Sequence, residues 1–398
     1  MPARKRLPAA IGGAVLVVGT LAGCASAHPV SGTALAEPGA QPSTSTAPTA
    51  SEPSGTSQPP SSRPVSPSSC DSLISSLGVR AQVAQLVVPG VDAANPAAVT
   101  KLVQQQQIGG FFVGGNKTTL LQNHALDAVQ KAAKIPVSVS VDEEGGRVQR
   151  IDDLDGSMPS ARELAATKTP AEVRTLGVQR GKQLRARGIT VDYAPDADVS
   201  DEPDDAVIGD RSYSSDPAKV RQYAMAFAEG LRQGGVTPVL KHFPGHGHGS
   251  GDSHKGTVTT PPIDQLRKVD LKPYENIADY GAVEVMVGHL DVPGLTNGVP
   301  ASISPAAYRL LRGDYHFTGP IITDDLGGMK AITDQYPLPD AVLKALQAGA
   351  DEALFSSGNG DVGAVLDRLV KAVSSGELPA DRVAASVKRV LKSKHACT

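Results

Sequence analysis

The stretch PAKVRQYAMAFAEGLRQGGVTPVLKH, residues 217–242, decides the fold class. Its first part, Pro217–Gln233, is an amphipathic segment with apolar residues at helical spacing, and two glycines follow it. Its second part, Pro238–His242, is a short and nearly continuous apolar run that ends on Lys241 and His242. A helix that leads through a glycine turn into a strand buried on both faces is typical of a parallel α/β sheet.

The same alternation of apolar runs and amphipathic segments continues in both directions along the chain. Eight such units predict a single (β/α)₈ TIM-type barrel, and a doubly wound parallel sheet is the alternative. The predicted strands are Gln85–Val91, Ile108–Val113, Pro136–Val141, Thr190–Ala194, Pro238–His242, Val283–His289, Pro320–Thr323 and Glu352–Ser356. The predicted helices include Thr118–Ala133, Ala171–Arg187, Pro217–Gln233, Pro305–Arg312, Leu338–Ala348 and Gly363–Ser374.

Polar side chains gather where the third to the seventh predicted strands end. In a barrel, the active site is built at the carboxyl ends of several strands, so these side chains are expected to converge there. Their clustering favours the barrel over the doubly wound sheet. They are Asp142, Asp198, Lys241, His242, His289, Asp291, Asp324 and Asp325.

The N-terminus carries the features of an export signal. Basic residues at Arg4–Arg6 precede a short apolar run, Ile11–Ala22, which is typical of a secretory signal peptide over residues 1–23. The run ends in Leu21–Cys24, which looks like a bacterial lipobox. We therefore expect Cys24 to be lipidated and to anchor the protein to the outer face of the cell membrane. An ordinary signal peptide with an incidental cysteine is the alternative.

A change in composition separates the leader from the folded part. Residues 24–69 are rich in Pro, Ser and Thr and have few large apolar side chains, which predicts a disordered tether. Residues 70–398 then form one domain, with Cys70 and Cys397 at its two ends. Export permits disulfides, and the first and last elements of a closed barrel are neighbours. A Cys70–Cys397 disulfide is therefore predicted.

Composition excludes two classes of function. The formal net charge is −3 and the pI is near 6.3, so the chain lacks the basic surface of a nucleic-acid-binding protein. The three cysteines never stand at zinc-ligand spacing. Aromatic residues make up only 4%, so the core must consist mainly of Val, Leu, Ile and Ala.

Residues 241–254 hold the densest set of reactive side chains, KHFPGHGHG at 241–249 and DSH at 252–254. The alternating glycines predict a flexible loop. Four histidines suggest a metal site, but their spacing differs from that of helical metal-binding pairs and Lys241 would repel a cation, so we expect no metal. Asp252 two residues before His254 instead predicts an acid/base dyad, with a merely solvated loop as the alternative.

Three further motifs lie at strand ends or in loops. IITDDL at 321–326 places Asp324 at a strand end, where a carboxylate is a candidate nucleophile, whereas Asp325 better fits the N-cap of a helix over Leu326–Ala331. VDEEGGRVQR at 141–150 places an acid at a strand end before a glycine turn and two arginines, which suits the binding of sugar hydroxyls. IGDRSY at 208–213 is a loop with one arginine that could reach inward. Taken singly, these two loops are also compatible with solvated charge.

Together, the strings VDEEGGRVQR, GDRSY, KHFPGHGHGSGDSH and ITDDLGGMKAI, in this order, resemble the bacterial N-acetyl-β-glucosaminidases of glycoside hydrolase family 3, the NagZ type. The resemblance covers Ala81 to Lys392. It implies that Asp324 is the nucleophile, that His254 is the general acid/base and that Asp252 orients it. It also implies that the terminal N-acetylglucosamine is held by Asp142, Arg150, Arg211, Lys241 and His242.

The same resemblance implies a retaining, exo-acting enzyme that removes terminal β-linked N-acetylglucosamine from peptidoglycan or muropeptide fragments. We expect no cofactor, no nucleic-acid partner and a monomer, with the membrane as a partner only through Cys24. Two alternatives stay open, a phosphorylase that uses a neutral His base and a non-catalytic saccharide-binding lipoprotein. The resting position of the Gly245–His254 loop stays open as well, and neither His246 nor His248 receives a catalytic role.

Overall fold

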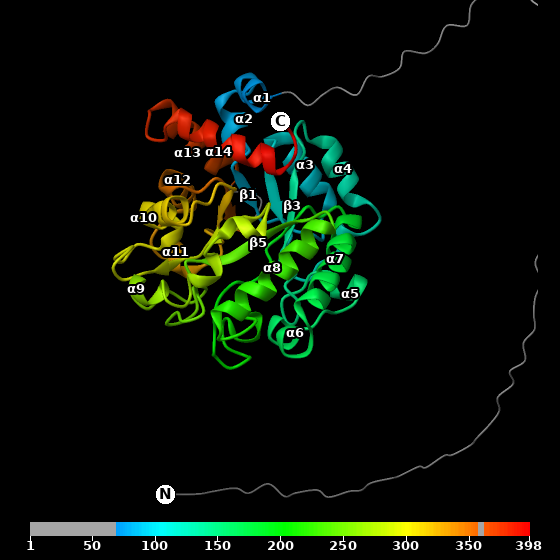
Figure 1. The fold of residues 1–398 in the computed structure, drawn as a ribbon. Coiled ribbons are helices and arrows are strands. Elements are labelled where there is room, and N and C mark those ends of the chain that lie inside the picture. The colour runs from blue at the N-terminus through cyan, green and yellow to red at the C-terminus, as the bar shows by residue number, and fades with distance from the viewer. Residues whose placement is uncertain (1–68, 357–361) are drawn as a thin grey trace, which may run out of the picture. The chain divides into compact units, whose positions relative to one another are not determined.

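The structure is a computed structural model that describes residues 69–356 and 362–398 (Figure 1). The predicted signal peptide, the lipidation site Cys24 and the tether up to residue 68 lie outside the described residues. Within the described part of the chain, no helix combines the length and the apolar character needed to cross a membrane.

All eight predicted strands are present and pair in parallel. Each is shorter than the apolar run that predicted it, except β5, which extends one residue beyond the predicted run at each end. The strands are β1 (Val87–Pro89), β2 (Gly110–Phe112), β3 (Ser138–Val141), β4 (Val191–Asp192), β5 (Thr237–Phe243), β7 (Glu284–Val287), β9 (Ile321–Thr323) and β10 (Ala353–Phe355).

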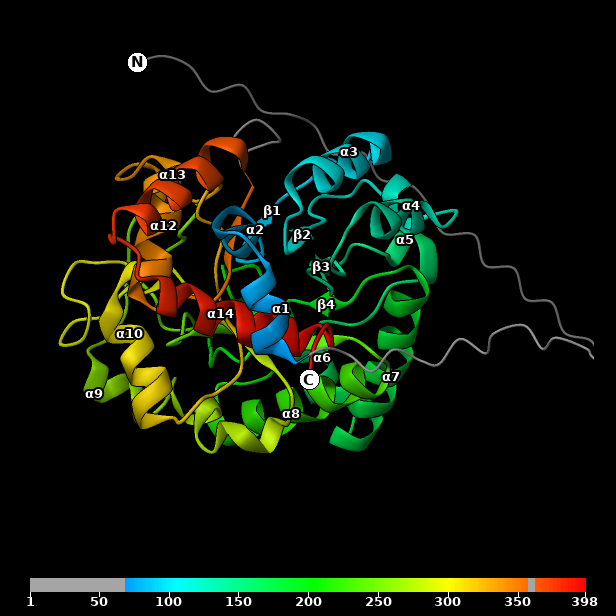
Figure 2. The same ribbon diagram turned by 90° about the horizontal axis from the view of Figure 1, so that it is seen from above.

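These strands form a curled parallel sheet with helices on its outer side (Figure 2). Six strands pair in the order β2-β3-β4-β5-β7-β9, and β1 pairs with β10. Isolated parallel bridges connect Gly90 with Phe112 and Ile322 with Glu352, at the two edges of the six-stranded sheet. The carboxyl ends of the strands, which the polar motifs follow, thus lie on one side of the fold.

The two faces of the sheet are packed separately, which explains why the strands read as continuous apolar runs. The larger apolar cluster combines strand residues such as Val139 and Leu240 with helix residues such as Val103 and Phe227, so it fills the space between sheet and helices. Alternate strand residues form a second cluster on the concave face. Its members are Val88, Phe112, Val191, Tyr193, Val239, Met286, Ile322 and Leu354.

The predicted helices are present with shifted ends, but two of them are only partly α-helical. The helix predicted at Thr118–Ala133 is α-helical only at Ala125–Ala132, because Asn123 and His124 adopt left-handed backbone conformations and separate it from a 3₁₀ turn at Thr119–Leu121. Pro217–Gln233 and Leu338–Ala348 are confirmed as α8 and α12 with unchanged bounds. The helix predicted at Pro305–Arg312 is α-helical only at Pro305–Arg309 and continues as a π-helix. The α-helices are α1 (Cys70–Ser76), α2 (Val79–Ala84), α3 (Pro96–Gln106), α4 (Ala125–Ala132), α5 (Asp152–Asp155), α6 (Ala161–Thr167), α7 (Pro170–Ala186), α8 (Pro217–Gln233), α9 (Ile263–Leu266), α10 (Pro305–Arg309), α11 (Lys330–Thr333), α12 (Leu338–Ala348), α13 (Val362–Ser374) and α14 (Ala380–Ser393).

Short elements that the sequence analysis did not predict lie in the connections. Two two-residue strands, β6 (Val258–Thr259) and β8 (Leu290–Asp291), pair in parallel and join the loop after β5 to the loop after β7. The short 3₁₀ and π turns are η1 (Thr119–Leu121), η2 (Gly209–Arg211), η3 (Lys272–Tyr274), η4 (Ile277–Tyr280), η5 (Ala301–Ile303) and the π turn η6 (Leu310–Asp314).

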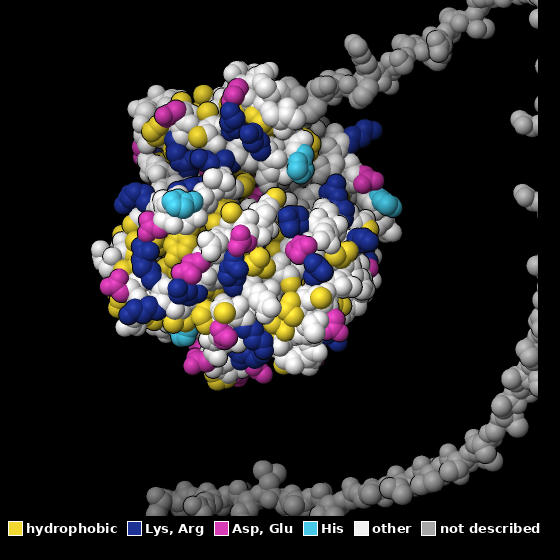
Figure 3. All heavy atoms as spheres, viewed as in Figure 1, with side chains coloured by type: hydrophobic (Ala, Val, Ile, Leu, Met, Phe, Trp, Pro, Cys, Tyr) yellow, Lys and Arg dark blue, Asp and Glu magenta, His cyan; other side chains and the backbone are white. Residues whose placement is uncertain are grey.

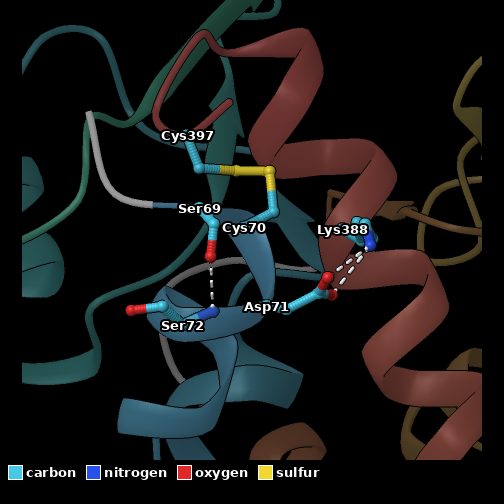
Figure 4. Close-up of a disulfide and its surroundings, with 6 residues drawn as sticks. All are labelled: Ser69, Cys70, Asp71, Ser72, Lys388 and Cys397. Atoms are coloured by element: carbon cyan, nitrogen blue, oxygen red, sulfur yellow. Dashed lines mark hydrogen bonds and ion pairs between the residues drawn. A yellow bond between two sulfur atoms is a disulfide. The ribbon is translucent and has the colours of Figure 1, made fainter. Parts of the chain in front are cut away.

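A disulfide joins the two ends of the folded part, as predicted (Figure 4). The Cα atoms of Cys70 and Cys397 are 4.9 Å apart, well within the range that a disulfide can bridge. Beside it, the Cys70 amide donates to the Thr398 carbonyl, and Lys388 of α14 pairs with Asp71 of α1 at 2.8 Å. The first and last helices are therefore fastened to each other.

Candidate active site

A buried ionic network forms where β3 and β5 end. Lys241 of β5 is buried, and its Nζ lies 2.7 Å from Asp142 Oδ1 and 2.5 Å from Glu144 Oε1. Burial alone would lower the pKa of Lys241, but the carboxylates of Asp142 and Glu144 outweigh it and raise this pKa above its ordinary value. Lys241 is therefore a permanent cation. Since an ammonium group has three donors and two are used here, one remains for a ligand.

Two arginines complete this network. Arg211 of η2 donates from Nε and Nη2 to the two carboxylate oxygens of Glu144, each at 2.8 Å. Burial would raise the pKa of Glu144, but the charges of Arg211 and Lys241 hold it well below its ordinary value. Arg150 Nη2 lies 3.5 Å from Asp142 Oδ2. Four of the five predicted sugar-binding residues thus meet around Glu144 and Asp142.

His242, the fifth predicted sugar-binding residue, is oriented by a buried carboxylate. Its Nδ1 lies 2.7 Å from Asp198 Oδ2, and its Nε2 lies 3.5 Å from Arg211 Nη2. Asp198 also accepts the backbone N–H of His246 at 2.6 Å. Burial opposes the charge of Asp198, but His242 and these hydrogen bonds lower its pKa to about 2. An ionised Asp198 requires a proton on Nδ1 of His242, which leaves Nε2 for the arginine or a ligand.

Asp324, the predicted nucleophile, lies buried directly after β9. Its backbone N–H donates to the Val287 carbonyl of β7, and its Oδ1 accepts the Asp325 N–H at 2.8 Å. Burial would raise the pKa of Asp324, but His289, His242, the Asp325 hydrogen bond and Lys241 together lower it. The carboxylate is therefore ionised at neutral pH, which a nucleophilic role requires.

The turn that carries Asp324 is held by Asp325 and His289. Asp325 Oδ1 accepts the backbone N–H groups of Gly327 and Gly328, each at 2.9 Å, and that of Ser356 at 2.8 Å. The prediction that it caps a helix over Leu326–Ala331 is wrong in position, because α11 begins only at Lys330 and Asp325 caps the preceding turn. His289 Nε2 contacts the Asp325 carbonyl at 2.9 Å.

Asp252 and His254 meet as their spacing predicts, on the loop after β5. His254 Nδ1 and its backbone N–H lie 2.9 and 3.0 Å from Asp252 Oδ1. Burial would raise the pKa of Asp252, but the hydrogen bonds from His254 lower it. The His254 side chain is 64% exposed, and its Nε2 makes no hydrogen bond to any residue that the structure describes. That nitrogen is thus free to exchange a proton, although no hydrogen bond joins the described residues His254 and Asp324.

Hydrogen bonds along its length hold the loop that bears this dyad. Its Ser253 carbonyl accepts the Ala331 N–H at 3.1 Å, and the Ser253 hydroxyl donates to Met329 Sδ at 3.3 Å. Nearer the strand, His248 Nδ1 lies 2.7 Å from Asp270 Oδ1, a hydrogen bond that raises the pKa of His248. The two contacts of Ser253 join the dyad to the segment that follows Asp324. The hydrogen bond to Asp270 gives His248 a structural role.

One group of side chains among the described residues could hold a cation. The ligand atoms of Asp196, Asp198 and His242 lie within 4.8 Å of one another. However, the Asp198 oxygens already accept hydrogen bonds from two backbone N–H groups and the His242 ring, and Arg211 Nη2 lies 3.7 Å from Asp196 Oδ2. The guanidinium supplies the positive charge there, so these residues fit a metal poorly.

Three residues of the site have roles that the sequence analysis did not assign. Glu144 joins Lys241 to Arg211, and Asp198 and His289 orient groups on other strands. Glu144 had a signal, because it stands two residues after Asp142 beyond a strand end, and alternate residues share a face in an extended chain. Asp198 and His289 follow predicted strands, so the sequence indicated that they lie near the site. It did not indicate that they contact His242 and the Asp325 carbonyl.

Comparison with known proteins agrees with this geometry. A family model described as the glycosyl hydrolase family 3 N-terminal domain matches residues 78–393. The curated protein beta-hexosaminidase LpqI of Mycobacterium tuberculosis is 52% identical over 339 residues, which cover 82% of this chain and 86% of that protein.

Solved structures give the same result. The structure described as M tuberculosis LpqI superposes with a TM-score of 0.79 at 50% identity, covering 83% of this chain and 97% of that chain. A family 3 beta-N-acetylglucosaminidase from Paenibacillus sp. superposes with a TM-score of 0.76 at 30% identity, covering 81% of this chain and 63% of that chain. The chain therefore belongs to glycoside hydrolase family 3 and is a glycoside hydrolase related to beta-hexosaminidases.

Proposed function

We propose that this protein is a retaining, exo-acting β-N-acetylglucosaminidase that removes terminal β-linked N-acetylglucosamine. The observation that carries the proposal is Asp324, a buried carboxylate that His289, His242 and Lys241 keep ionised at a strand end. The named activities of the relatives, beta-hexosaminidase and beta-N-acetylglucosaminidase, support the same substrate class.

In the first step, the Asp324 carboxylate attacks the anomeric carbon and forms a glycosyl–enzyme ester. The bond to the leaving oxygen breaks, and His254 donates its Nε2 proton to that oxygen. In the second step, water attacks the anomeric carbon, His254 accepts a proton from it and Asp324 is released. Most retaining enzymes use two carboxyl groups for these roles, whereas here an imidazole held by Asp252 replaces one.

We assign substrate binding to the buried network whose Lys241 and His242 act electrostatically on Asp324. Lys241 and Arg211 present donors at fixed positions, and His242 presents Nε2, while Asp142 is partly exposed and can accept a hydrogen bond from a sugar hydroxyl. Because these groups are already paired with one another, they lose little side-chain entropy when a sugar binds. We assign no catalytic step to them.

The test uses purified full-length protein with a nitrophenyl N-acetylglucosaminide beside the corresponding glucoside. We expect turnover of the first substrate only. Asp324→Asn should abolish turnover and the mass increase of a trapped glycosyl–enzyme, and His254→Ala should cost about 10²–10⁴-fold. His316→Ala and Asp334→Asn, which change exposed residues outside the site, serve as controls. A fully active Asp324→Asn enzyme would overturn the proposal.

Phosphorolysis is the second candidate, because an uncharged imidazole base repels an incoming phosphate less than a carboxylate does. Product analysis with and without phosphate separates the two reactions, since phosphorolysis yields a sugar 1-phosphate. Saccharide binding without turnover under both conditions would instead identify a binding lipoprotein. Activity that survives an excess of chelator would support a reaction without metal.

We further propose that the natural substrate is a cell-wall fragment and that Cys24 is lipidated, which places the enzyme on the outer face of the cell membrane. The lipobox-like sequence and the glycan chemistry support this, although Cys24 lies outside the described residues. Cys24→Ala should move the protein from the membrane fraction to the soluble fraction. A variant that stays in the membrane fraction would contradict lipidation.

We also propose that the eight strands close into a complete (β/α)₈ barrel. The β1–β10 pair and the bridges at Gly90–Phe112 and Ile322–Glu352 support closure, because they link both edges of the six-stranded sheet to that pair. A crystal structure with either bridge replaced by an open gap would contradict it.

A further inference from the structure

A cavity of about 1030 Å³ lies at the end of the sheet opposite the candidate active site. Its walls include Val137, Thr190 and Pro320, which directly precede β3, β4 and β9. The C-terminal part of α14 forms another wall, and Figure 2 looks onto this end, where α14 crosses in front of the strands. Strands such as β5 separate the two ends by on the order of 20 Å.

The lining of this cavity carries a large excess of positive charge. Five of its side chains are Lys or Arg, two are His, and Asp127 is the single carboxylate among the described lining residues. Asp127 lies 3.8 Å from His124, outside the lining. Figure 3 shows Lys and Arg side chains gathered on the surface over α14.

Three of these cations are exposed and without an ion-pair partner among residues 69–356 and 362–398. They are Arg185 of α7, Arg232 of α8 and Lys392 of α14, and they come from three separate helices. The other two are engaged, because Arg389 pairs with Asp351 at 3.0 Å and Lys394 donates to the Gly109 carbonyl. The unpaired cations leave an uncompensated positive field inside a concave surface, which concentrates anions.

One simpler explanation has to be separated from a binding site. Arg185, Arg232 and Lys392 each stand in the last turn of a helix, where a cation stabilises the helix dipole. Stabilisation of a helix dipole requires a cation at each helix end, but it does not explain why the cations of three helices line the same cavity. The chain also offers a control, because Arg309 and Lys371 occupy the last turns of α10 and α13 but do not line the cavity.

We propose that this cavity binds a multivalent anion with two or more phosphate or carboxylate groups, at a site distinct from the glycosidase site. Guanidinium groups recognise both anions through paired hydrogen bonds, and Lys392 adds a mobile point charge. The cavity is large enough for a ligand of several charged groups.

The test is calorimetric titration of full-length protein with pyrophosphate and, separately, with citrate at low ionic strength. We expect one saturable site for at least one of the two probes, weakened by added salt. The double variant Arg232→Gln/Lys392→Gln should bind at least ten-fold more weakly while keeping its N-acetylglucosaminidase activity. The control variant Arg309→Gln/Lys371→Gln removes the same charge from helix ends elsewhere and should bind like the unmodified protein.

Three outcomes would overturn the proposal. The first is absence of saturable binding of both probes. The second is equal weakening in the two double variants, which would mean a general effect of net charge. The third is loss of binding when the active site is saturated with N-acetylglucosamine, because the anion would then occupy the glycosidase site.

Discussion

Glu144 illustrates how much one buried residue decides at this site. It lies between Lys241 and Arg211, at 2.5 and 2.8 Å, and balances two cations that would otherwise repel each other in a dry environment. The two cations in turn keep the Glu144 pKa low, so the network is charged throughout the physiological pH range. In the proposed binding site, a sugar meets donors whose positions are already set.

We predict that Glu144→Gln destabilises the protein by about 3 kcal/mol, because it leaves Lys241 and Arg211 buried with a charge uncompensated. The KM for the aryl N-acetylglucosaminide should rise as the two donors shift. Urea unfolding and steady-state kinetics measure both effects. Glu229→Gln, which removes a partly exposed ion pair with Arg174, should change stability by less than about 1 kcal/mol. Equal effects of the two variants would contradict the prediction.

Glu284 is a second buried carboxyl group with an unusual pKa, at the end of the sheet away from the site. Burial raises its pKa to about 7, against the opposing effects of the Ser393 hydrogen bond at 2.6 Å and of Lys394. The folded protein therefore retains a proton on Glu284 over a pH range in which the unfolded chain has lost it.

We predict that the free energy of unfolding falls as pH rises from about 4.5 to about 7, by at most about 1.4 kcal/mol per pH unit from this group. The sign follows because a raised carboxyl pKa stabilises the folded state fully only below the unfolded value. Glu284→Gln should flatten this slope in urea titrations at pH 5, 6, 7 and 8. Glu163→Gln, at an exposed position, should keep it. Parallel curves for Glu284→Gln and the unmodified protein would refute the assignment.

Among the elements, α7 and α8 make an unusually close contact that depends on glycine. A Cβ on Gly230 of α8 would lie 2.3 Å from the Arg174 carbonyl oxygen and 2.8 Å from Gly177 Cα of α7. A Cβ on Gly177 would lie 2.9 Å from the Phe227 carbonyl oxygen. These helices precede β4 and β5, so their spacing helps to set where Lys241 lies.

We predict that Gly230→Ala destabilises the protein by about 1–3 kcal/mol, because the backbones of α7 and α8 would have to separate. The gain in helix propensity, at most about 1 kcal/mol, does not offset this. Gly363→Ala is the matched control, since a Cβ there meets nothing within 4 Å and α13 should be no less stable. Thermal unfolding of both variants tests this prediction. A Gly230→Ala variant that is more stable than the unmodified protein would show that α7 and α8 have room for a Cβ at this position.

For the whole molecule, the Cys70–Cys397 disulfide closes the chain across 327 positions. A cross-link over so long a loop restricts the unfolded chain strongly, whereas the candidate active site lies at the other end of the sheet. Its contribution should therefore appear in stability and not in catalysis.

We predict that Cys70→Ser/Cys397→Ser lowers the free energy of unfolding by about 2–5 kcal/mol and leaves kcat and KM unchanged at 25 °C. Chemical unfolding and kinetics of the oxidised protein, the reduced protein and the double variant test this. The reduced protein should behave like the double variant. A loss of activity at temperatures where both remain folded would contradict the claim that the disulfide affects stability and not catalysis.

The sequence alone determined the features that depend on neighbouring residues. Each buried strand is a local apolar run, so all eight strands were predictable, and Asp252 and His254 meet because they are two positions apart. The weaker predictions concern short elements such as β6 and β8, which two residues cannot specify without a pairing partner.

The tertiary structure decided what depends on which strand ends come together. The contacts of Glu144 with Arg211, of Asp198 with His242 and of His289 with the Asp325 turn join residues from different strands or loops. The same holds for the cationic cavity, whose charges come from α7, α8 and α14. Such contacts span tens to hundreds of positions, and only the curvature and register of the sheet bring their members within hydrogen-bond distance.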